Sequence, residues 1–226
     1  MTRMSLLLAA SAAILSVVAA PASALKPFTA QYDASFKGIS AGGSMALSQQ
    51  GNRWTYSMGI RNSMANLSQA TVFEDAAGRY RPLGGSDRST YLMKTRSIVT
   101  HYDWKGLRVR WTGDVKPQRA GPVTMQPGDM DALLVNLALV RDVGFGRTSM
   151  NYRLLENGKA KSLTYRVAGR EKITVGGRSL DTTKVVQSAG GKQTTAWIAA
   201  GVPAPVRIVQ REDGSDVFRL QLTSWR

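Results

Sequence analysis

Apolar and polar side chains alternate along most of the chain after Leu25, the spacing that places successive side chains on opposite faces of a β-strand. The clearest run covers residues 28–36, where Phe28, Tyr32 and Phe36 share one face. Further runs with this alternation begin at Trp54, Met150, Leu163 and Phe218. The pattern therefore predicts several antiparallel strands, each with one buried and one solvated face.

Residue pairs that favour tight turns separate these runs. They are Gly42-Gly43, Gly84-Gly85, Asn157-Gly158, Gly176-Gly177, Gly190-Gly191 and Asp213-Gly214. Glycine and asparagine readily adopt the positive φ that two-residue hairpins require. At the usual spacing of such turns, the sequence predicts about a dozen strands.

One hairpin, between Ile98 and Gly113, has a register that its side chains specify. A two-residue turn at Lys105-Gly106 pairs Trp104 with Leu107, Tyr102 with Val109 and Thr100 with Trp111. The opposite face then pairs Asp103 with Arg108 and His101 with Arg110. This register separates apolar from polar side chains almost completely. We interpret His101 as a neutral surface histidine, because a neighbouring guanidinium disfavours the imidazolium form.

One segment has the period of an α-helix, from about Asp129 to Val143. Its apolar stripe consists of Met130, Leu133, Leu134, Leu137 and Val140. Asp129 is placed to cap the first turn, and Asp131 lies near the positive end of the helix dipole. A single amphipathic helix normally buries its stripe, so we expect this one to pack onto one face of the sheet, with a gate over a ligand as the alternative.

Together these elements predict a mostly β fold. We expect a single strongly curved antiparallel sheet, or half-open barrel, of about a dozen strands with one principal α-helix. No break in composition marks a second domain. Residues 25–226 are therefore expected to form a single antiparallel β domain.

Residues 1–24 are set apart from this fold. Arg3 gives a basic start, an apolar run extends from Leu6 to Ala20, and Ala22-Ser23-Ala24 resembles a cleavage site. These features predict a cleavable secretory signal peptide. The apolar run is shorter than the roughly twenty residues of a membrane-spanning helix, and no cysteine follows it to carry a lipid anchor. We therefore expect a periplasmic protein without a transmembrane span in the mature chain.

The amino-acid composition excludes several classes of catalytic and metal-binding site. Hydrophobic residues make up 43% of the 226 positions, enough for a packed core. The chain has no cysteine and one histidine, which excludes disulfide scaffolds, thiol nucleophiles and the usual cysteine or multi-histidine metal sites. The sequence also lacks the motifs of a nucleophile elbow and of a phosphate-binding loop. We therefore expect no catalytic residues, no metal and no cofactor.

Basic charge is the stronger signal. Lys and Arg number 30 against 15 Asp and Glu, a formal net charge of +15. The excess is greatest between Arg79 and Arg119, and arginines suit forked contacts to phosphate and carboxylate. An exported protein rarely meets nucleic acid, so we expect no nucleic-acid partner. Lipid headgroups or acidic envelope polymers are the expected anionic partners, and a basic face that only aids solubility is the alternative.

The chain also resembles a known family. The resemblance rests on residues 165–173, Thr182-Thr183-Lys184-Val185, Trp197 and residues 203–208, together with the Tyr32 to Phe36 strand, Gly38, Gly43 and the helix from Asp129 to Arg141. These segments resemble the bacterial domain-of-unknown-function family 3108, whose members are exported envelope proteins. The resemblance implies an antiparallel sheet. A curved sheet with one helix near its concave side is also similar to the half-open barrels of periplasmic lipoprotein carriers, although fold analogy alone does not establish function.

The first functional hypothesis is a non-enzymatic binding or carrier module for a lipid-like or anionic envelope ligand. One face of the strands would line an apolar groove with Phe28, Tyr32, Phe36, Trp54, Tyr56, Met58 and Ile60. Arginines at the rim would hold an anionic headgroup. The candidate binding residues are Trp54, Tyr56, Arg88, Arg96, Arg108 and Arg110. The alternative is an ordinary core, which is the more common location of such an aromatic stripe.

Two further hypotheses belong to other classes. In one, the protein is a structural or assembly factor of the cell envelope that docks a partner through its basic face. In the other, a carboxylate-dependent glycoside hydrolase uses a close acidic pair. The available pairs are Glu74-Asp75, Asp129 with Asp131, and Glu212-Asp213. Turns and helix caps account for these carboxylates as well, so this third hypothesis is the weakest.

Overall fold

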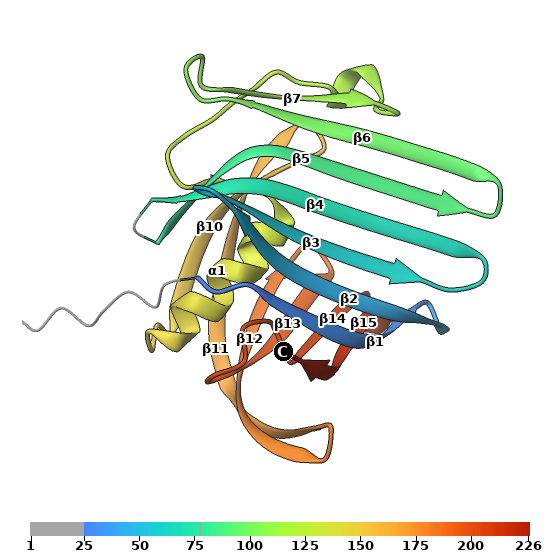
Figure 1. Ribbon diagram of the computed structural model, residues 1–226, viewed down its shortest axis with the longest axis vertical. Helices are drawn as coiled ribbons and strands as arrows, with labels where there is room; N and C mark the ends of the chain where they lie inside the picture. Colours follow the sequence, from blue (N-terminus) through green and yellow to red (C-terminus); the bar gives the residue numbers. More distant parts are fainter. Residues whose placement is uncertain (1–24, 77) are drawn as a thin grey trace, which may run out of the picture.

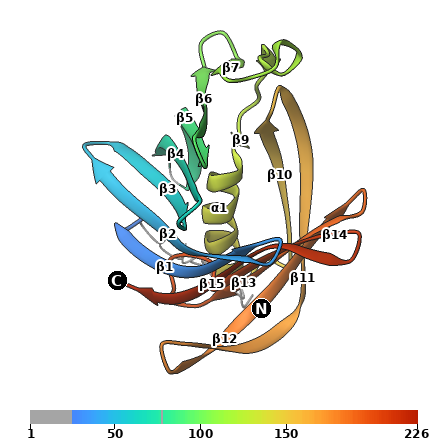
Figure 2. The ribbon, with the colours of Figure 1, turned by 90° about the vertical axis from the view of Figure 1, so that its right-hand side faces the viewer.

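The computed structural model describes residues 25–76 and 78–226, which form one 15-stranded sheet and one α-helix (Figures 1 and 2). The predicted signal peptide, residues 1–24, lies outside the described residues. The first strands are β1 (Phe28–Phe36), β2 (Ile39–Gln50), β3 (Arg53–Arg61), β4 (Ala65–Ala76), β5 (Arg79–Tyr91), β6 (Lys94–Asp103) and β7 (Arg108–Gly113). No helix within these described ranges is long and apolar enough to cross a membrane.

A connecting segment and a second series of strands complete the fold. The connection contains the 3-10 helix η1 (Pro117–Arg119), β8 (Val123–Thr124), β9 (Asp129–Met130) and α1 (Ala132–Gly144). The second series is β10 (Ser149–Glu156), β11 (Lys159–Val175), β12 (Arg178–Ala189), β13 (Lys192–Ala199), β14 (Arg207–Glu212) and β15 (Ser215–Trp225).

The sheet is open and strongly curved, and its first and last strands meet in its middle. Its order is β8-β7-β6-β5-β4-β3-β2-β1-β15-β14-β13-β12-β11-β10-β9. All neighbours are antiparallel except β9 and β10. This confirms the predicted fold class. The strand count exceeds about a dozen in part because the two-residue strands β8 and β9 have no alternation to detect.

The helix packs on the concave face of the sheet, inside its curve. It contacts β3, β4 and β5 on one side and β10 and β13 on the other, as Figure 2 shows. Its buried residues are Leu133, Leu134, Val135, Leu137, Ala138, Leu139 and Asp142. Leu133, Leu134 and Leu137 of the predicted stripe are buried as expected, and further residues of the helix are buried because the sheet curves around it.

The start of the helix also differs from the prediction. The N-cap is Asp131, whose carboxylate accepts a hydrogen bond from the Leu134 backbone N–H at 2.9 Å. Asp129, the predicted cap, belongs instead to β9, where it accepts from the Gln126 backbone N–H and pairs with Arg153. Two acidic residues two positions apart both suit an N-terminus, and the sequence did not distinguish them.

Two substitutions of Asp131 distinguish its role as the helix N-cap from the cost of burying its carboxylate. Burial raises the pKa of Asp131 above its ordinary value of 3.8, although hydrogen bonds from Thr71 and Leu134 oppose the rise. We expect Asp131→Ala to lower the free energy of unfolding by about 1–2 kcal/mol, because it removes the cap. Asp131→Asn keeps the cap and is expected to be at least as stable as the parent at pH 7.

The raised pKa of Asp131 predicts how the free energy of unfolding changes with pH. A raised folded-state pKa means that the folded protein holds the proton more tightly than the unfolded chain. The stability contributed by protonated Asp131 is therefore complete below 3.8 and is lost as pH rises through the folded-state pKa. Urea unfolding between pH 3 and pH 8, in steps of about one unit, measures this loss. An Asp131→Asn protein with the same decline as the parent would contradict the assignment.

The β6–β7 hairpin has the predicted strand register. Thr100 pairs with Trp111, His101 with Arg110, Tyr102 with Val109, and Asp103 with Arg108. Its turn, however, spans the four residues 104–107 rather than two. Asp103 Oδ1 accepts from the Gly106 backbone N–H at 2.9 Å, and Trp104 Nε1 donates to the Pro82 carbonyl at 2.6 Å. These bonds hold Trp104 and Leu107 outside the ladder.

Two of the glycine pairs read as turns lie inside strands instead. Gly42-Gly43 belongs to β2 and Gly84-Gly85 to β5. A Cβ at Gly43 would approach Tyr32 Cβ to 3.1 Å and Leu220 Cδ2 to 3.3 Å. Glycine is therefore needed for close packing at this position and not for a turn. The other four predicted pairs do form turns.

A buried carboxylate joins the end of α1 to the sheet. Asp142 Oδ1 accepts from Arg141 Nε at 2.7 Å, and Asp142 Oδ2 accepts from the Tyr152 hydroxyl at 2.8 Å. Arg147 lies 3.4 Å from the same carboxylate. Arg141 also stacks over the Tyr80 ring, 4.8 Å from its centroid. This network connects the helix with β5 and β10.

Candidate ligand-binding site

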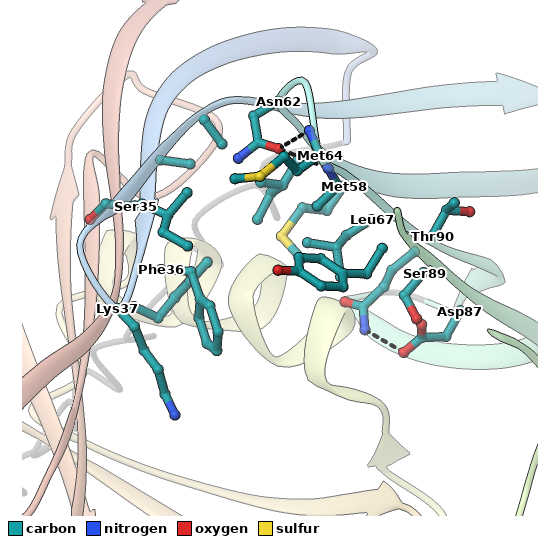
Figure 3. Close-up of a pocket in the computed structure, with 18 of the residues that line it drawn as sticks. Ser35, Phe36, Lys37, Met58, Asn62, Met64, Leu67, Asp87, Ser89 and Thr90 are labelled. Carbon is teal, nitrogen blue, oxygen red and sulfur yellow. Dashed lines mark hydrogen bonds between the residues drawn. The ribbon is translucent and has the colours of Figure 1, made fainter. Parts of the chain in front are cut away.

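A cavity of about 650 Å³ opens at the end of the concave face away from α1. Three hairpins build most of it: β1–β2, β3–β4 and β5–β6. Figure 1 shows the tips of these hairpins side by side at its right, and Figure 3 shows the lining side chains. The apolar lining residues are Ala34, Phe36, Ile39, Ala41, Met58, Ile60, Met64, Ala65, Leu67, Tyr91 and Phe218.

Small inward side chains on β1 and β2 contribute open space to the cavity. Near the helix, the inward position of β3 holds Tyr56, which is fully buried. At the cavity, Ala34 and Ala41 face each other across β1 and β2. These small side chains leave open space that α1 does not reach. The same strands thus have a filled core at one end and a hollow at the other.

A few polar groups interrupt the apolar lining. Asp87 Oδ2 accepts from Gln69 Nε2 at 2.9 Å, and Figure 3 shows this pair on the cavity wall. At the rim, Asn62 Oδ1 accepts from the backbone N–H groups of Met64 and Ala65 at 2.9 and 2.8 Å. Lys37 lies in the β1–β2 turn, with its ammonium group 5.7 Å from the centre of the Phe36 ring.

A smaller cavity of about 110 Å³ continues from the first toward the helix. Gln69 and Asp87 line both, so they separate an apolar chamber from a polar one. The polar chamber contains Asp131 and Thr71, whose hydroxyl donates to the Asp131 carboxylate. The two chambers adjoin at Gln69 and Asp87.

The predicted groove residues divide between the core and the cavity. Phe36, Met58 and Ile60 line the cavity. Trp54 and Tyr56, the two aromatic site candidates, are buried in the core instead, and the Tyr56 hydroxyl donates to Met45 Sδ at 3.2 Å. Phe28 and Tyr32 are core residues as well. The aromatic alternation identified the correct face of the sheet but not the end that is hollow.

The four candidate arginines do not form one cluster. Arg88, Arg108 and Arg110 are exposed on the convex face, since they alternate with buried or cavity-lining residues such as Asp87 and Val109. Arg96 has the opposite parity and pairs with the cavity-lining Ser89, and its Nε donates to the Asp114 carbonyl at 3.1 Å. The cation that sequence analysis missed is Lys37.

Other cavity residues were missed because their strand was read as two pieces. Ile39 and Ala41 continue the inward alternation of β2, but the turn assigned to Gly42-Gly43 concealed this. Met64 and Tyr91 lie at hairpin tips, where apolar residues are not expected.

The acidic pairs have structural partners elsewhere. Glu74 lies near Arg81, Glu212 pairs with Lys192 at 2.6 Å, and Asp75 accepts from the Gly78 backbone N–H. Among the described residues that line the larger cavity, Asp87 is the single carboxylate, whereas Asp131 and Glu156 line the smaller one. His101 is exposed and bonds the Thr112 hydroxyl at 2.8 Å. The cavity therefore offers chiefly apolar contact, with one cation at its rim.

Comparison with known proteins gives one family match. A profile described as "Protein of unknown function (DUF3108)" matches residues 31–223. This range includes the cavity and the helix, and the match confirms the resemblance noted from the sequence. No curated protein matches the chain.

Proposed function

Because the chain belongs to the DUF3108 family of proteins of unknown function, its own cavity is the guide to its role, and we propose that it is a non-enzymatic binding or carrier module for a lipid-like ligand. The observation that carries this proposal is the apolar cavity of about 650 Å³ at the open end of the sheet. Small-molecule sites typically enclose roughly 300–1,000 Å³ and combine apolar walls with a few polar groups. The cavity meets both criteria.

Exposed apolar side chains at the cavity support a ligand of this kind. Phe36 is 54% and Tyr91 57% exposed, although both are inward-facing and large. A ligand that covers them gains roughly 25 cal/mol for each Å² of apolar surface removed from water. An acyl chain supplies such surface without bringing polar groups that the walls cannot satisfy.

Charge near the mouth supports an anionic group on the ligand. Lys37 lines the cavity at its rim on the β1–β2 hairpin. Lys94 pairs with the lining residue Tyr91 on the β5–β6 hairpin, with β3 and β4 between the two. Arg96 follows on the same face of β6. These cations lie on both sides of the mouth, so a carboxylate or phosphate there is attracted from both. Export to the periplasm belongs to the same proposal and rests on residues 1–24.

A pair of matched probes tests this function. We expect the protein to bind dansyl-undecanoic acid and its methyl ester, with increased dansyl fluorescence in the apolar cavity. Lys37→Glu is expected to weaken binding of the acid about fivefold, roughly 1 kcal/mol, and to leave the ester unaffected. Lys105→Glu, in the exposed turn of the β6–β7 hairpin, is the control and should change neither.

The outcomes separate the two parts of the proposal. Failure of the parent protein to bind either probe, together with no lipid found by mass spectrometry after purification without detergent, would refute the lipid-binding function. Equal weakening of acid and ester by Lys37→Glu would refute the role of Lys37 in holding a charged group.

A second function is favoured by the convex arginines. Arg88 on β5 and Arg108 and Arg110 on β7 are exposed on the same convex face, and strand pairing places His101 beside Arg110. A structural or assembly factor could dock an acidic partner on this face. Loss of partner binding on replacing the three arginines with glutamine, with cavity binding unchanged, would favour this function over the carrier.

A further inference from the structure

The three hairpins around the cavity mouth carry an unusual set of exposed side chains. We define the tip surface as Phe36, Ile39, Met64, Leu67, Tyr91, Leu92 and Met93. These residues include most of the large hydrophobic side chains that are exposed in the described chain. Met93 is 98% exposed and Leu92 64%, at the turn between β5 and β6.

Neither stability nor turn geometry accounts for these residues. Hairpin turns ordinarily use glycine, asparagine, aspartate or serine. Met93 is almost completely exposed and therefore buries little within this chain. Exposed apolar side chains gathered in one region, and rimmed by polar groups, indicate an interaction site.

The charges within the three tip segments are all of one sign. The three tip segments, residues 36–39, 61–65 and 91–96, contain Lys37, Arg61, Lys94 and Arg96 and no acidic residue. All four cations are exposed. Each basic residue close to an anionic lipid surface contributes about 1 kcal/mol of attraction. Apolar tips flanked by cations combine the two contributions that hold peripheral proteins at a membrane.

The position of the cavity mouth favours a bilayer over a protein partner. The tips of the three hairpins lie side by side (Figure 1), and Phe36, Met64 and Leu67 line the cavity there (Figure 3). A protein seated across them would cover the opening through which a ligand must pass. A fluid bilayer seated there would let an acyl chain pass between membrane and cavity without entering water.

We propose that the tip surface docks onto a lipid bilayer containing anionic lipids, with Leu92 and Met93 inserted among the headgroups. This inference goes beyond the proposed function, and its choice of a bilayer over a protein partner rests on that function. The exposure of the tips does not, because it does not depend on a ligand in the cavity. The tip surface is the surface through which a bound lipid would be collected or delivered.

The absence of cysteine from the chain allows a direct test of insertion. Met93→Cys labelled with the fluorophore NBD is mixed with vesicles of equal parts phosphatidylglycerol and phosphatidylcholine. We expect its fluorescence to rise several-fold and to be quenched by nitroxide-labelled lipid. Leu107→Cys, labelled in the same way, should show no change, because the β6–β7 turn lies outside the tip surface.

A matched pair of variants tests the energetics by vesicle flotation. Leu92 and Leu107 are both exposed leucines in hairpin turns, with φ of 52° and 51°. Asparagine tolerates this backbone at both positions, so the two substitutions have similar effects on folding. We expect Leu92→Asn with Met93→Ser to weaken vesicle binding at least tenfold and Leu107→Asn to leave it unchanged.

Three results would overturn the docking proposal. They are unchanged NBD fluorescence at position 93, equal flotation of the two leucine variants, and loss of flotation only when Arg88, Arg108 and Arg110 are replaced with glutamine. A dimer that dissociates on tip substitution, without vesicle binding by the parent, would assign the surface to a second copy instead. Solution binding of dansyl-undecanoic acid by the tip variant is expected to be unchanged, so failure of docking is distinguishable from failure of the cavity.

Discussion

Asp142→Ala is expected to lower the free energy of unfolding by about 3 kcal/mol, because it leaves Arg141 and the Tyr152 hydroxyl without their common acceptor. The side chain of Asp142 is 2% exposed and that of Arg141 18%, so water replaces little of what is lost. Removing one member of a buried ion pair typically costs about 3–5 kcal/mol. Because Arg141 is partly exposed, we expect a loss of stability at the low end of this range. Urea unfolding, followed by circular dichroism and tryptophan fluorescence, measures the change.

Two neighbouring substitutions serve as controls for Asp142. Arg147→Ala removes a partner whose side chain is 59% exposed, so we expect a change of less than about 1 kcal/mol. Tyr152→Phe removes one hydrogen bond and is expected to cost about 1 kcal/mol. If Asp142→Ala is no more destabilising than Arg147→Ala, the network does not hold the helix to the sheet.

Ala41→Trp is expected to weaken binding of dansyl-undecanoic acid at least tenfold while leaving the fold intact. Ala41 lines the cavity and faces Ala34 across the β1–β2 ladder, so an indole there occupies the volume that an acyl chain needs. The open mouth allows the ring to enter the cavity without displacing core residues. Fluorescence titration of the probe measures the affinity, and a tenfold loss corresponds to about 1.4 kcal/mol.

The matched control for Ala41→Trp lies five residues further along the same strand. Ala46 has the opposite parity and pairs with Ser57 and Thr29, so its side chain points to the convex face. Ala46→Trp should therefore leave probe affinity unchanged. Equal weakening by both substitutions would indicate a general effect on the sheet, and no weakening by Ala41→Trp would show that the probe binds elsewhere.

The sequence predicted those parts of the fold that depend on local alternation. The β1 strand and the register of the β6–β7 hairpin were correct because each side chain in them has a clear preference for one face. The position of the helix inside the curve was not predictable in this way. Its surroundings depend on strands distant in sequence, and the stripe of Leu133, Leu134 and Leu137 is common to helices on flat and on curved sheets.

The site was harder to predict because the core and the cavity are lined by the same types of apolar side chain. Tyr56 and Met58 share an inward face of β3, yet only Met58 borders the cavity. The two positions differ because α1 packs near Tyr56 and does not extend to Met58. The alternation of residues along a strand carries no information about where the helix ends. The arginines were also difficult to place from sequence. The basic stretch covers three strands, so its charged side chains lie on both faces of the sheet. Arg88 and Arg96 therefore lie on opposite faces although they are close in sequence.

The seam between β1 and β15 has a consequence for how the chain reaches this shape. Each arm of the sheet is a succession of neighbouring hairpins that can assemble as soon as their own residues are available. The seam instead joins Phe36 to Phe218 and Thr29 to Arg226, among the largest sequence separations in the molecule. Loop-closure entropy favours the hairpins within each arm over this long-range union, so we expect the seam to form late in folding. Until then β1 presents an unpaired apolar edge, the stage at which a chaperone has most to protect.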